Sequence, residues 1–133
     1  FKLESPVNAE MIDGSDEIQK LFNEMGSLAG RPWVMLSAGA KKDSFRNILS
    51  HAFKAGASGF LAGRAIWQDA FSAYPDWQKI INGLSSNGLP YLREISELAD
   101  QNALPWKSHY CYGTAGARMS PQDATFRQTY RPL

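Results

Sequence analysis

The sequence has 133 residues, which is the size of one domain or of part of a larger one. Hydrophobic residues make up 44% of it and charged residues 20%, so the chain can bury a core and is not expected to be disordered. A net charge of +1 is too small for nucleic acid to be the main partner. The single cysteine, Cys111, excludes an internal disulfide and a multi-cysteine metal site.

Uncharged runs such as 55–63 are far shorter than the roughly 20 apolar residues that a membrane-spanning helix needs. No basic segment followed by an apolar one opens the chain, as it would in a secretory signal. We therefore expect a soluble, cytoplasmic protein with neither a membrane nor a nucleic-acid partner.

The composition changes near residue 104. Residues 1–103 carry 10 basic and 12 acidic side chains, net −2, whereas 104–133 carry four basic and one acidic, net +3. The second part also has four Gly and Pro residues beyond Pro105 and no sustained hydrophobic period. We predict one structured region over 1–103 and an irregular C-terminal extension over 104–133, docked or partly disordered.

Within the first region, apolar runs and turn residues predict alternating strands and helices. Strands are expected over 1–4, 33–36 and 58–62. Helices are expected from an N-cap at Ser15 to Gly30, from Asp43 or Ser44 to Gly56, from Arg64 onward, and from Pro90, as first helical residue, to about Ala103. This alternation predicts an α/β fold whose parallel strands are joined by right-handed crossovers.

Two of the predicted strands end in the same way. Leu36-Ser37-Ala38-Gly39 and Leu61-Ala62-Gly63-Arg64 each pass from strand through small residues toward a helix N-terminus. Free N–H groups and the positive end of a helix dipole attract anions there, and Ser37 and Arg64 add a hydroxyl and a forked cation. One such turn alone more often only permits a tight bend. Two adjacent turns favour an anion site made by Ser37, Gly39, Gly63 and Arg64.

Lys2 and Glu4 are two residues apart on the first predicted strand, so their side chains point to the same face. Inside a covered sheet or barrel, burial near other cations would keep the amine neutral and able to attack a ketone. The alternative is a structural Lys–Glu ion pair or a frayed strand end. Spacing alone favours that alternative.

The other candidate residues have ordinary interpretations. His51 is expected at the surface or at the edge of the core, and His109 with Cys111 supplies too few ligands for a metal. Four aromatic residues are expected to pack the closing helices, with Trp67 near enough to the anion turn to border it. These residues are Trp67, Phe71, Tyr74 and Trp77.

Three segments together resemble the class I tagatose-1,6-bisphosphate aldolase family. They are FKLESP at 1–6, PWVMLSAG at 32–39 and AGASGFLAGRAIW at 55–67. The third looks most like the sulfofructosephosphate aldolase branch. The resemblance covers about residues 1–103, which correspond to the C-terminal half of a family member, and the segment from Pro105 onward resembles nothing in the family.

The resemblance implies strands six to eight of a TIM (β/α)8 barrel, with Lys2 as the Schiff-base lysine in a Lys-x-Glu-x-Pro context and Glu4 on the family's glutamate. Ser37, Gly39, Gly63 and Arg64 match the strand ends that hold the substrate's anionic group. The earlier strands, with the residues they contribute, are not in this sequence, so we expect a piece of a larger polypeptide or a chain that packs against others.

The implied activity is Schiff-base cleavage of a ketose 1-phosphate to dihydroxyacetone phosphate and a three-carbon aldehyde, with no metal or cofactor. The substrate would be tagatose or fructose bisphosphate, or 6-deoxy-6-sulfofructose 1-phosphate. Partners would be the sugar phosphate and either further copies of the chain in a homo-oligomer or the remainder of the barrel. The alternative is a non-catalytic phosphosugar-binding module or a structural half-barrel.

Overall fold

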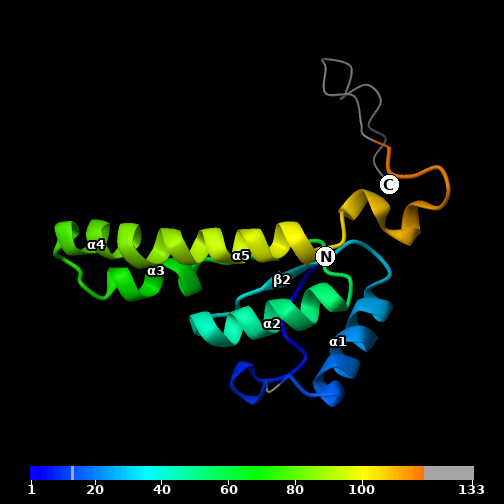
Figure 1. Cartoon of the computed structure of the whole chain (residues 1–133), viewed down its shortest axis with the longest axis horizontal. Helices are drawn as coiled ribbons and strands as arrows, with labels where there is room; N and C mark the ends of the chain where they lie inside the picture. The colour runs from blue at the N-terminus through cyan, green and yellow to red at the C-terminus, as the bar shows by residue number, and fades with distance from the viewer. Residues whose placement is uncertain (13, 119–133) are drawn as a thin grey trace, which may run out of the picture.

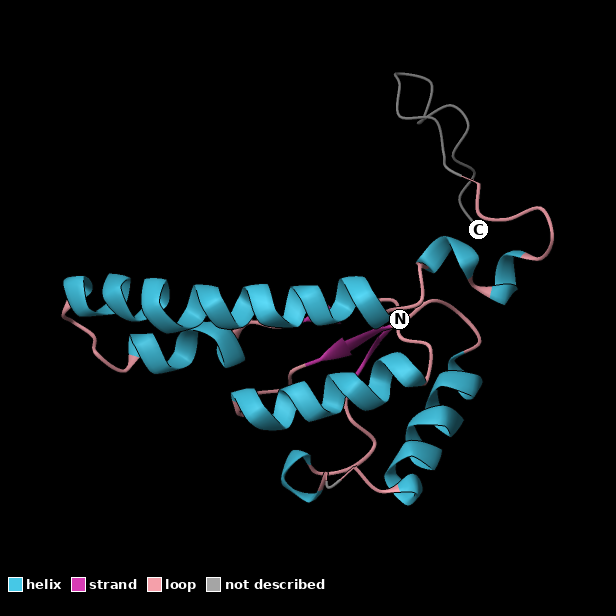
Figure 2. Ribbon diagram, in the orientation of Figure 1, coloured by secondary structure: helices cyan, strands magenta, loops and turns pink. Residues whose placement is uncertain are grey.

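The computed structural model describes residues 1–12 and 14–118. Its sheet has three short parallel strands in the order β1-β2-β3, with Lys2 opposite Val34 and Met35 opposite Phe60. The strands are β1 (Lys2–Leu3), β2 (Val34–Leu36) and β3 (Phe60–Leu61). The predicted α/β arrangement with parallel pairing is confirmed for these strands, each of which is shorter than its predicted range (Figure 2).

Helices connect the strands and follow them. The α-helices are α1 (Asp16–Ala29), α2 (Lys42–Lys54), α3 (Arg64–Phe71), α4 (Trp77–Gly83) and α5 (Leu89–Asn102). The short helical segments are η1 (Ala9–Met11), η2 (Leu84–Gly88), η3 (Trp106–Ser108) and η4 (Tyr110–Tyr112).

Helix α1 begins and ends where the sequence predicts. The hydroxyl of Ser15 accepts a hydrogen bond from the N–H of Ile18, and Gly30 ends the helix with φ at 60°. Helix α2 begins earlier than predicted, with Lys41 rather than Asp43 or Ser44 as its N-cap. Asp43 lies in the first turn, where its negative charge still favours the helix dipole.

Pro90 is the second residue of α5, next to its predicted place as first helical residue. The sequence did not predict that the chain is helical without a break from α4 through η2 to α5, so that a helical turn precedes Pro90 (Figure 1). Proline lacks an N–H, and its ring crowds the carbonyl four residues earlier. The turn just before it, η2, has the wider π-helical form that relieves this crowding.

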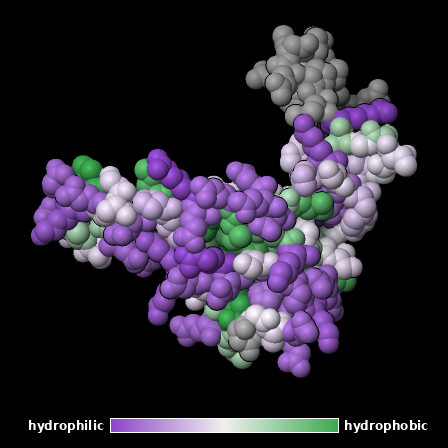
Figure 3. All heavy atoms as spheres, viewed as in Figure 1, coloured by the Kyte–Doolittle hydropathy of each residue, from purple (hydrophilic) through white to green (hydrophobic). Residues whose placement is uncertain are grey.

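The core lies around the central strand and α2. Met35 on β2 and the neighbouring Trp33 are fully buried, as are Phe45 and Leu49 on α2. Helix α2 contacts α1 on one side and α5 on the other (Figure 1). On the face shown in Figure 3, hydrophilic residues cover much of the long helix, and apolar residues gather between α5 and α2.

Helix α1 approaches the end of α2 closely at Gly26. A Cβ atom on Gly26 would lie 2.5 Å from the carbonyl oxygen of Ala55 and 3.4 Å from the ring of Trp33. Only a residue without a side chain fits between these atoms. Gly26 therefore sets how near α1 lies to the turn that follows α2.

His51 is buried, contrary to the predicted surface or boundary position, with only 5% of it exposed. Its Nδ1 lies 2.8 Å from Oε1 of Gln19, and its ring stacks on Phe22 at a centroid distance of 5.4 Å. Helix α1 thus supplies both the polar partner and the apolar surface that allow an imidazole to be buried.

The four aromatic residues expected to pack the closing helices are exposed, which corrects that prediction. Trp67 contacts Phe71 and Tyr74 contacts Trp77, each pair edge to face. Helices α3 and α4 extend beyond the sheet, which leaves these side chains exposed (Figure 1).

Beyond α5 the chain is joined to the segment that precedes β3. The N–H of Leu104 donates to the carbonyl of Ala57, and His109 is buried beside Cys111, whose N–H donates to the imidazole Nδ1. Residues 119–133 of the predicted extension lie outside the described residues. Within the described part, no helix is long and apolar enough to span a membrane.

Candidate functional site

The turn after β2 is tight and held from both sides. The N–H of Ser37 donates to the carbonyl of Leu61, and the N–H of Ala40 donates back to the carbonyl of Ser37. Ala38 and Gly39 have φ values of 47° and 83°, the left-handed conformation at both central positions. Their own N–H groups donate to no acceptor among the described residues. Two free donors thus remain at this strand end.

The chain leaves β3 differently, because Gly63 directly caps α3 without a side-chain hydrogen bond. The carbonyl of Gly63 accepts from the N–H groups of Ile66 and Trp67. The N–H groups of Arg64 and Ala65 at the first turn donate to nothing within the described part of the chain. The positive end of an eight-residue helix is therefore open at the end of β3.

The two turns lie against each other through Arg64 and Gly39. A Cβ atom at Gly39 would stand 3.2 Å from Nη2 of Arg64 and 3.4 Å from its Cζ. The guanidinium of Arg64 therefore lies over the β2 turn, where Gly39 leaves space for it because it has no side chain. Two segments predicted from sequence to form one anion site are adjacent, although their binding role stays a prediction.

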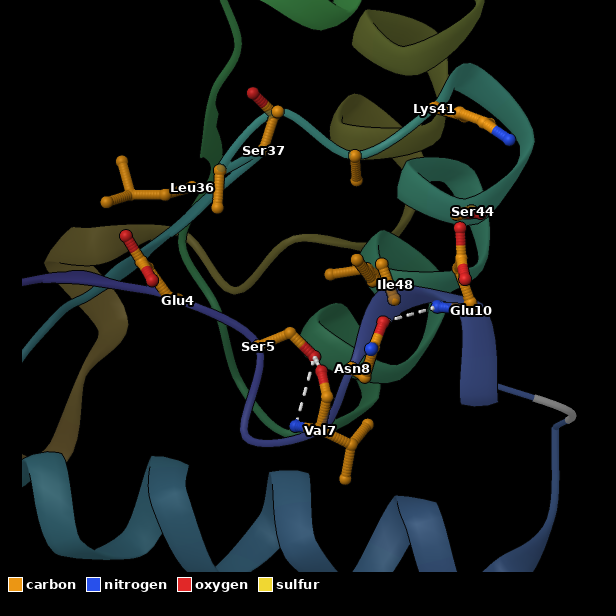
Figure 4. Close-up of a pocket in the computed structure, with 14 residues that line it drawn as sticks. Glu4, Ser5, Val7, Asn8, Glu10, Leu36, Ser37, Lys41, Ser44 and Ile48 are labelled. Carbon is orange, nitrogen blue, oxygen red and sulfur yellow. Dashed lines mark hydrogen bonds between the residues drawn. The ribbon is translucent and has the colours of Figure 1, made fainter.

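A pocket of about 470 Å³ opens beside the β2 turn. One wall is the segment after β1, from Glu4 to Glu10, and the other runs from Leu36 to Ser44, with Ile48 also in contact (Figure 4). Ser37 is among its lining residues and is only 6% exposed.

Local hydrogen bonds hold the β1 wall of this pocket. The hydroxyl of Ser5 donates to the carbonyl of Val7 and accepts from the N–H of the same residue, and Asn8 Oδ1 accepts from the N–H of Glu10 (Figure 4). These bonds fix the backbone between Glu4, which follows β1, and Glu10, which lies in η1. Both are exposed.

Lys2 and Glu4 are not buried as the sequence analysis anticipated for a covered interior. Both side chains are exposed, and Lys2 is not among the residues that line the pocket. The ion pair offered as an alternative is also not formed among the described residues. Strand β1 pairs only with β2 in this part of the chain and is therefore an edge strand of the described sheet.

Sequence reasoning missed the residues that α2 contributes to the pocket. Lys41 caps α2 and Ser44 lies in its first turn, and both line the pocket. A signal was present in the sequence, because Lys41 lies two residues and Ser44 five residues after Gly39 of the predicted anion turn. It was overlooked because Ser44 was interpreted only as a possible helix cap.

A polar clamp holds the first turns of α2 against α5. Arg46 donates two hydrogen bonds to the carboxylate of Glu94 and one to Asp43, and these bonds hold the pKa of Glu94 below its usual range and raise that of Arg46. The hydroxyl of Tyr91 donates to the carbonyl of Lys42 at 3.0 Å. Burial raises the pKa of Tyr91 to about 12.

Residues 1–12 and 14–118 contain no group of three or more His, Cys, Asp and Glu side chains placed to hold a metal ion.

Comparison with known proteins gives one consistent family. A family model described as DeoC/LacD family aldolase matches residues 2–69, a range that includes all six predicted site residues. The tagatose 1,6-diphosphate aldolase of Listeria monocytogenes serotype 4a (strain HCC23) is 30% identical over 123 residues, covering 83% of this chain and 36% of the relative. Tagatose 1,6-diphosphate aldolase 2 of Streptococcus mutans serotype c is 30% identical over 126 residues, covering 85% and 38%.

A third relative, tagatose 1,6-diphosphate aldolase 1 of Enterococcus faecalis, is 30% identical over 116 residues, covering 78% of this chain and 36% of its own. The chain therefore spans little more than a third of the length of the curated relatives that it matches.

Proposed function

The chain belongs to the DeoC/LacD aldolase family, and on that premise we propose that it provides the lysine and anion site of a Schiff-base aldolase. The substrate is a ketose 1-phosphate, either tagatose or fructose bisphosphate or 6-deoxy-6-sulfofructose 1-phosphate. The products are dihydroxyacetone phosphate and a three-carbon aldehyde. No metal or cofactor takes part.

The proposed fold of the whole domain is a TIM barrel, of which β1, β2 and β3 are strands six to eight. Three parallel βα units in sequence order support this proposal. The short helix α3 directly after β3 supports it further, because TIM barrels commonly bind phosphate at the loops after strands seven and eight and at the N-terminus of a short extra helix.

The contact of Arg64 with Gly39 is the observation that carries the anion site. It brings the free N–H groups of Ala38 and Gly39 next to a guanidinium and an open helix N-terminus. In the proposal these groups hold the C1 phosphate, with Ser37 and Gly63 completing the site. Holding the phosphate there fixes the neighbouring C2 carbonyl relative to the β1 end of the sheet.

Lys2 is the proposed nucleophile. Its neutral amine attacks the C2 ketone, and the carbinolamine loses water to give an iminium. After a base takes the proton of the C4 hydroxyl, the C3–C4 bond breaks and its electrons pass into the iminium, leaving an enamine. Protonation of the enamine at C3 and hydrolysis then release dihydroxyacetone phosphate and regenerate the amine.

Glu4 is the proposed aid to proton transfer at the carbinolamine, or the group that keeps Lys2 oriented. It lines the pocket directly after β1, two residues beyond Lys2. The base that takes the C4 proton lies outside this set of residues in the proposal.

Borohydride trapping tests the proposed function. The intact protein is incubated with dihydroxyacetone phosphate and sodium borohydride, digested and analysed by mass spectrometry. The expected result is a reduced adduct on Lys2. Saturable binding of dihydroxyacetone phosphate with no adduct on any lysine would establish the alternative, a non-catalytic phosphosugar-binding module.

The partner and location predictions also stay proposals. We propose a cytoplasmic enzyme whose β1 edge is covered by the remainder of a barrel or by another copy of the chain. Gel filtration with light scattering measures the assembly state of the intact protein.

A further inference from the structure

The indole of Trp67 lies over the first turn of α3. Its Nε1 is 3.5 Å from the place where a Cβ on Gly63 would stand, which is ordinary van der Waals contact. Trp67 is the fourth residue of the helix, and helical side chains lean toward the N-terminus. The indole nitrogen therefore lies beside the turn at which the free N–H groups of Arg64 and Ala65 are found.

The N–H of this indole is available to a ligand. Trp67 is 41% exposed, and its Nε1 donates to no acceptor among the described residues. The ring of Phe71 contacts it edge to face at a centroid distance of 5.4 Å and so restricts the plane in which the indole sits. The indole N–H of Trp67, whose orientation is restricted by Phe71, thus lies beside the open N-terminus of α3.

Arg64 and Trp67 border the same turn from two sides. The guanidinium of Arg64 leaves the turn toward Gly39, whereas the indole nitrogen of Trp67 lies at Gly63. A tetrahedral anion at the N-terminus of α3 has three outer oxygens and needs donors from more than one direction. Backbone N–H groups, one cation and one neutral donor together satisfy that need.

We propose that Trp67 is a substrate-binding residue whose indole Nε1–H donates a hydrogen bond to the substrate's C1 phosphate. This inference rests on the proposed function for the location of the anion. Trp67 acts on the phosphate and not on the reacting carbons, so it contributes to binding and positioning.

The chain provides a matched pair of variants for the test. Trp67→Phe keeps an aromatic ring beside Phe71 and removes the N–H donor together with the second ring of the indole. Trp77→Phe makes the same change at another exposed tryptophan in an edge-to-face pair, which contacts Tyr74 and lies in α4. Circular dichroism and thermal melting of both variants show whether either change disturbs the fold.

The direct readout is the indole N–H signal in the NMR spectrum of the ¹⁵N-labelled intact protein. Trp67→Phe removes one signal and thereby assigns it. Titration with dihydroxyacetone phosphate should move the Trp67 signal saturably and leave that of Trp77 in place. Dihydroxyacetone, which lacks the phosphate, should move neither.

The binding constants give the second readout. Loss of one hydrogen bond to the anion should weaken binding of dihydroxyacetone phosphate by about 3- to 10-fold in Trp67→Phe. Trp77→Phe should bind as the wild type does. A Trp67→Phe variant that binds with unchanged affinity would overturn the inference.

The experiment separates this inference from the proposed function. If the amides of Gly39 and Arg64 move with dihydroxyacetone phosphate but the Trp67 indole does not, the phosphate site stands and the role of Trp67 is refuted. If the indole moves but borohydride traps no lysine, Trp67 binds the anion and the aldolase mechanism is refuted. If no signal moves, the anion site and the role of Trp67 are both refuted.

Discussion

The candidate site has two parts, the anion turns after β2 and β3 and the pair Lys2 and Glu4 at β1, and the described residues form the first part more completely than the second. At the end of β2 the turn is closed by backbone hydrogen bonds, and at the end of β3 the chain passes directly into α3. The guanidinium of Arg64, from the first turn of α3, lies against Gly39 of the β2 turn. At the end of β1, Lys2 and Glu4 are exposed and form no ion pair within the described residues.

The two parts of the site differ because one depends on backbone geometry and the other on the surroundings of a side chain. The anion turns are built from backbone geometry and from neighbours close by in the sheet, so three βα units are enough to form them. A lysine that must be neutral depends instead on the groups that surround its side chain. We infer that binding of the anion and activation of the amine can be separated experimentally.

The largest effect is expected at the β1 end. Lys2→Met should abolish both aldol cleavage and borohydride trapping in the intact protein, because the nucleophile is lost while the anion turns remain. Binding of dihydroxyacetone phosphate, measured by calorimetry, should persist. A borohydride adduct on Lys41 or Lys42 instead would contradict the assignment of Lys2.

The second effect concerns Glu4. Glu4→Gln should slow turnover by roughly 10²- to 10⁴-fold if the carboxylate moves a proton, while substrate still binds. Steady-state kinetics with the cleaved ketose measure this change. Glu10→Gln is the matched control, since Glu10 lines the same pocket from the short helical segment η1. Turnover at the wild-type rate in Glu4→Gln would show that Glu4 has no part in proton transfer.

The third effect tests the β2–β3 end. Arg64→Ala should weaken binding of the phosphorylated substrate by roughly 10- to 150-fold, the value of one charge-assisted hydrogen bond. Part of the loss should appear in kcat, because the phosphate positions the reacting carbons. Arg64→Lys should restore only part of it, since an ammonium lacks the fork.

A substrate without the C1 phosphate provides the control for Arg64. Its kcat/KM should be low in the wild type and nearly unchanged in Arg64→Ala. If the variant also loses most of this activity, Arg64 supports the fold or the lysine and not the anion.

The smallest effect concerns the clamp that holds α2, whose first turn follows the anion loop. Tyr91→Phe removes the hydrogen bond to the carbonyl of Lys42 and should lower the free energy of unfolding by about 1 kcal/mol at pH 7. Urea unfolding followed by circular dichroism measures this, and Tyr74→Phe, at an exposed tyrosine, should change it little.

Tyr91 also predicts a pH dependence. Its pKa is about 12 in the folded protein, above the ordinary value of about 10, so the folded state favours the neutral phenol. The contribution of this group to the free energy of unfolding is fully present below pH 10 and is lost as the pH rises from about 10 to 12. The loss over that range should be smaller in Tyr91→Phe, and an equal loss in both proteins would contradict the assignment.

Local signals were sufficient to predict the parallel pairing and the adjacency of the two anion turns. Gly39 and Gly63 end strands and Ser15 caps a helix by rules that act over a few residues. The same rules predicted that the helix begins at Pro90 and did not predict the helical turn before it. No residue pattern in the sequence marks a π-helical turn that lets a helix continue up to a proline.

Burial at longer range could not be predicted. His51 is buried because Gln19 and Phe22, on another helix, provide a hydrogen-bond partner and a ring contact for its imidazole. Trp67 is exposed because α3 extends beyond the sheet. Both outcomes depend on how helices are placed relative to one another. A polar or aromatic residue at helical spacing is compatible with either position.

The contact at Gly26 restricts how sequences of this fold can change over time. Any side chain there meets the carbonyl of Ala55 at a distance that atoms do not adopt. Such a change becomes acceptable only together with a second one that moves the backbone of the turn at Ala55. Substitutions at these positions are therefore non-additive, and an evolutionary path that alters Gly26 first passes through a destabilised intermediate.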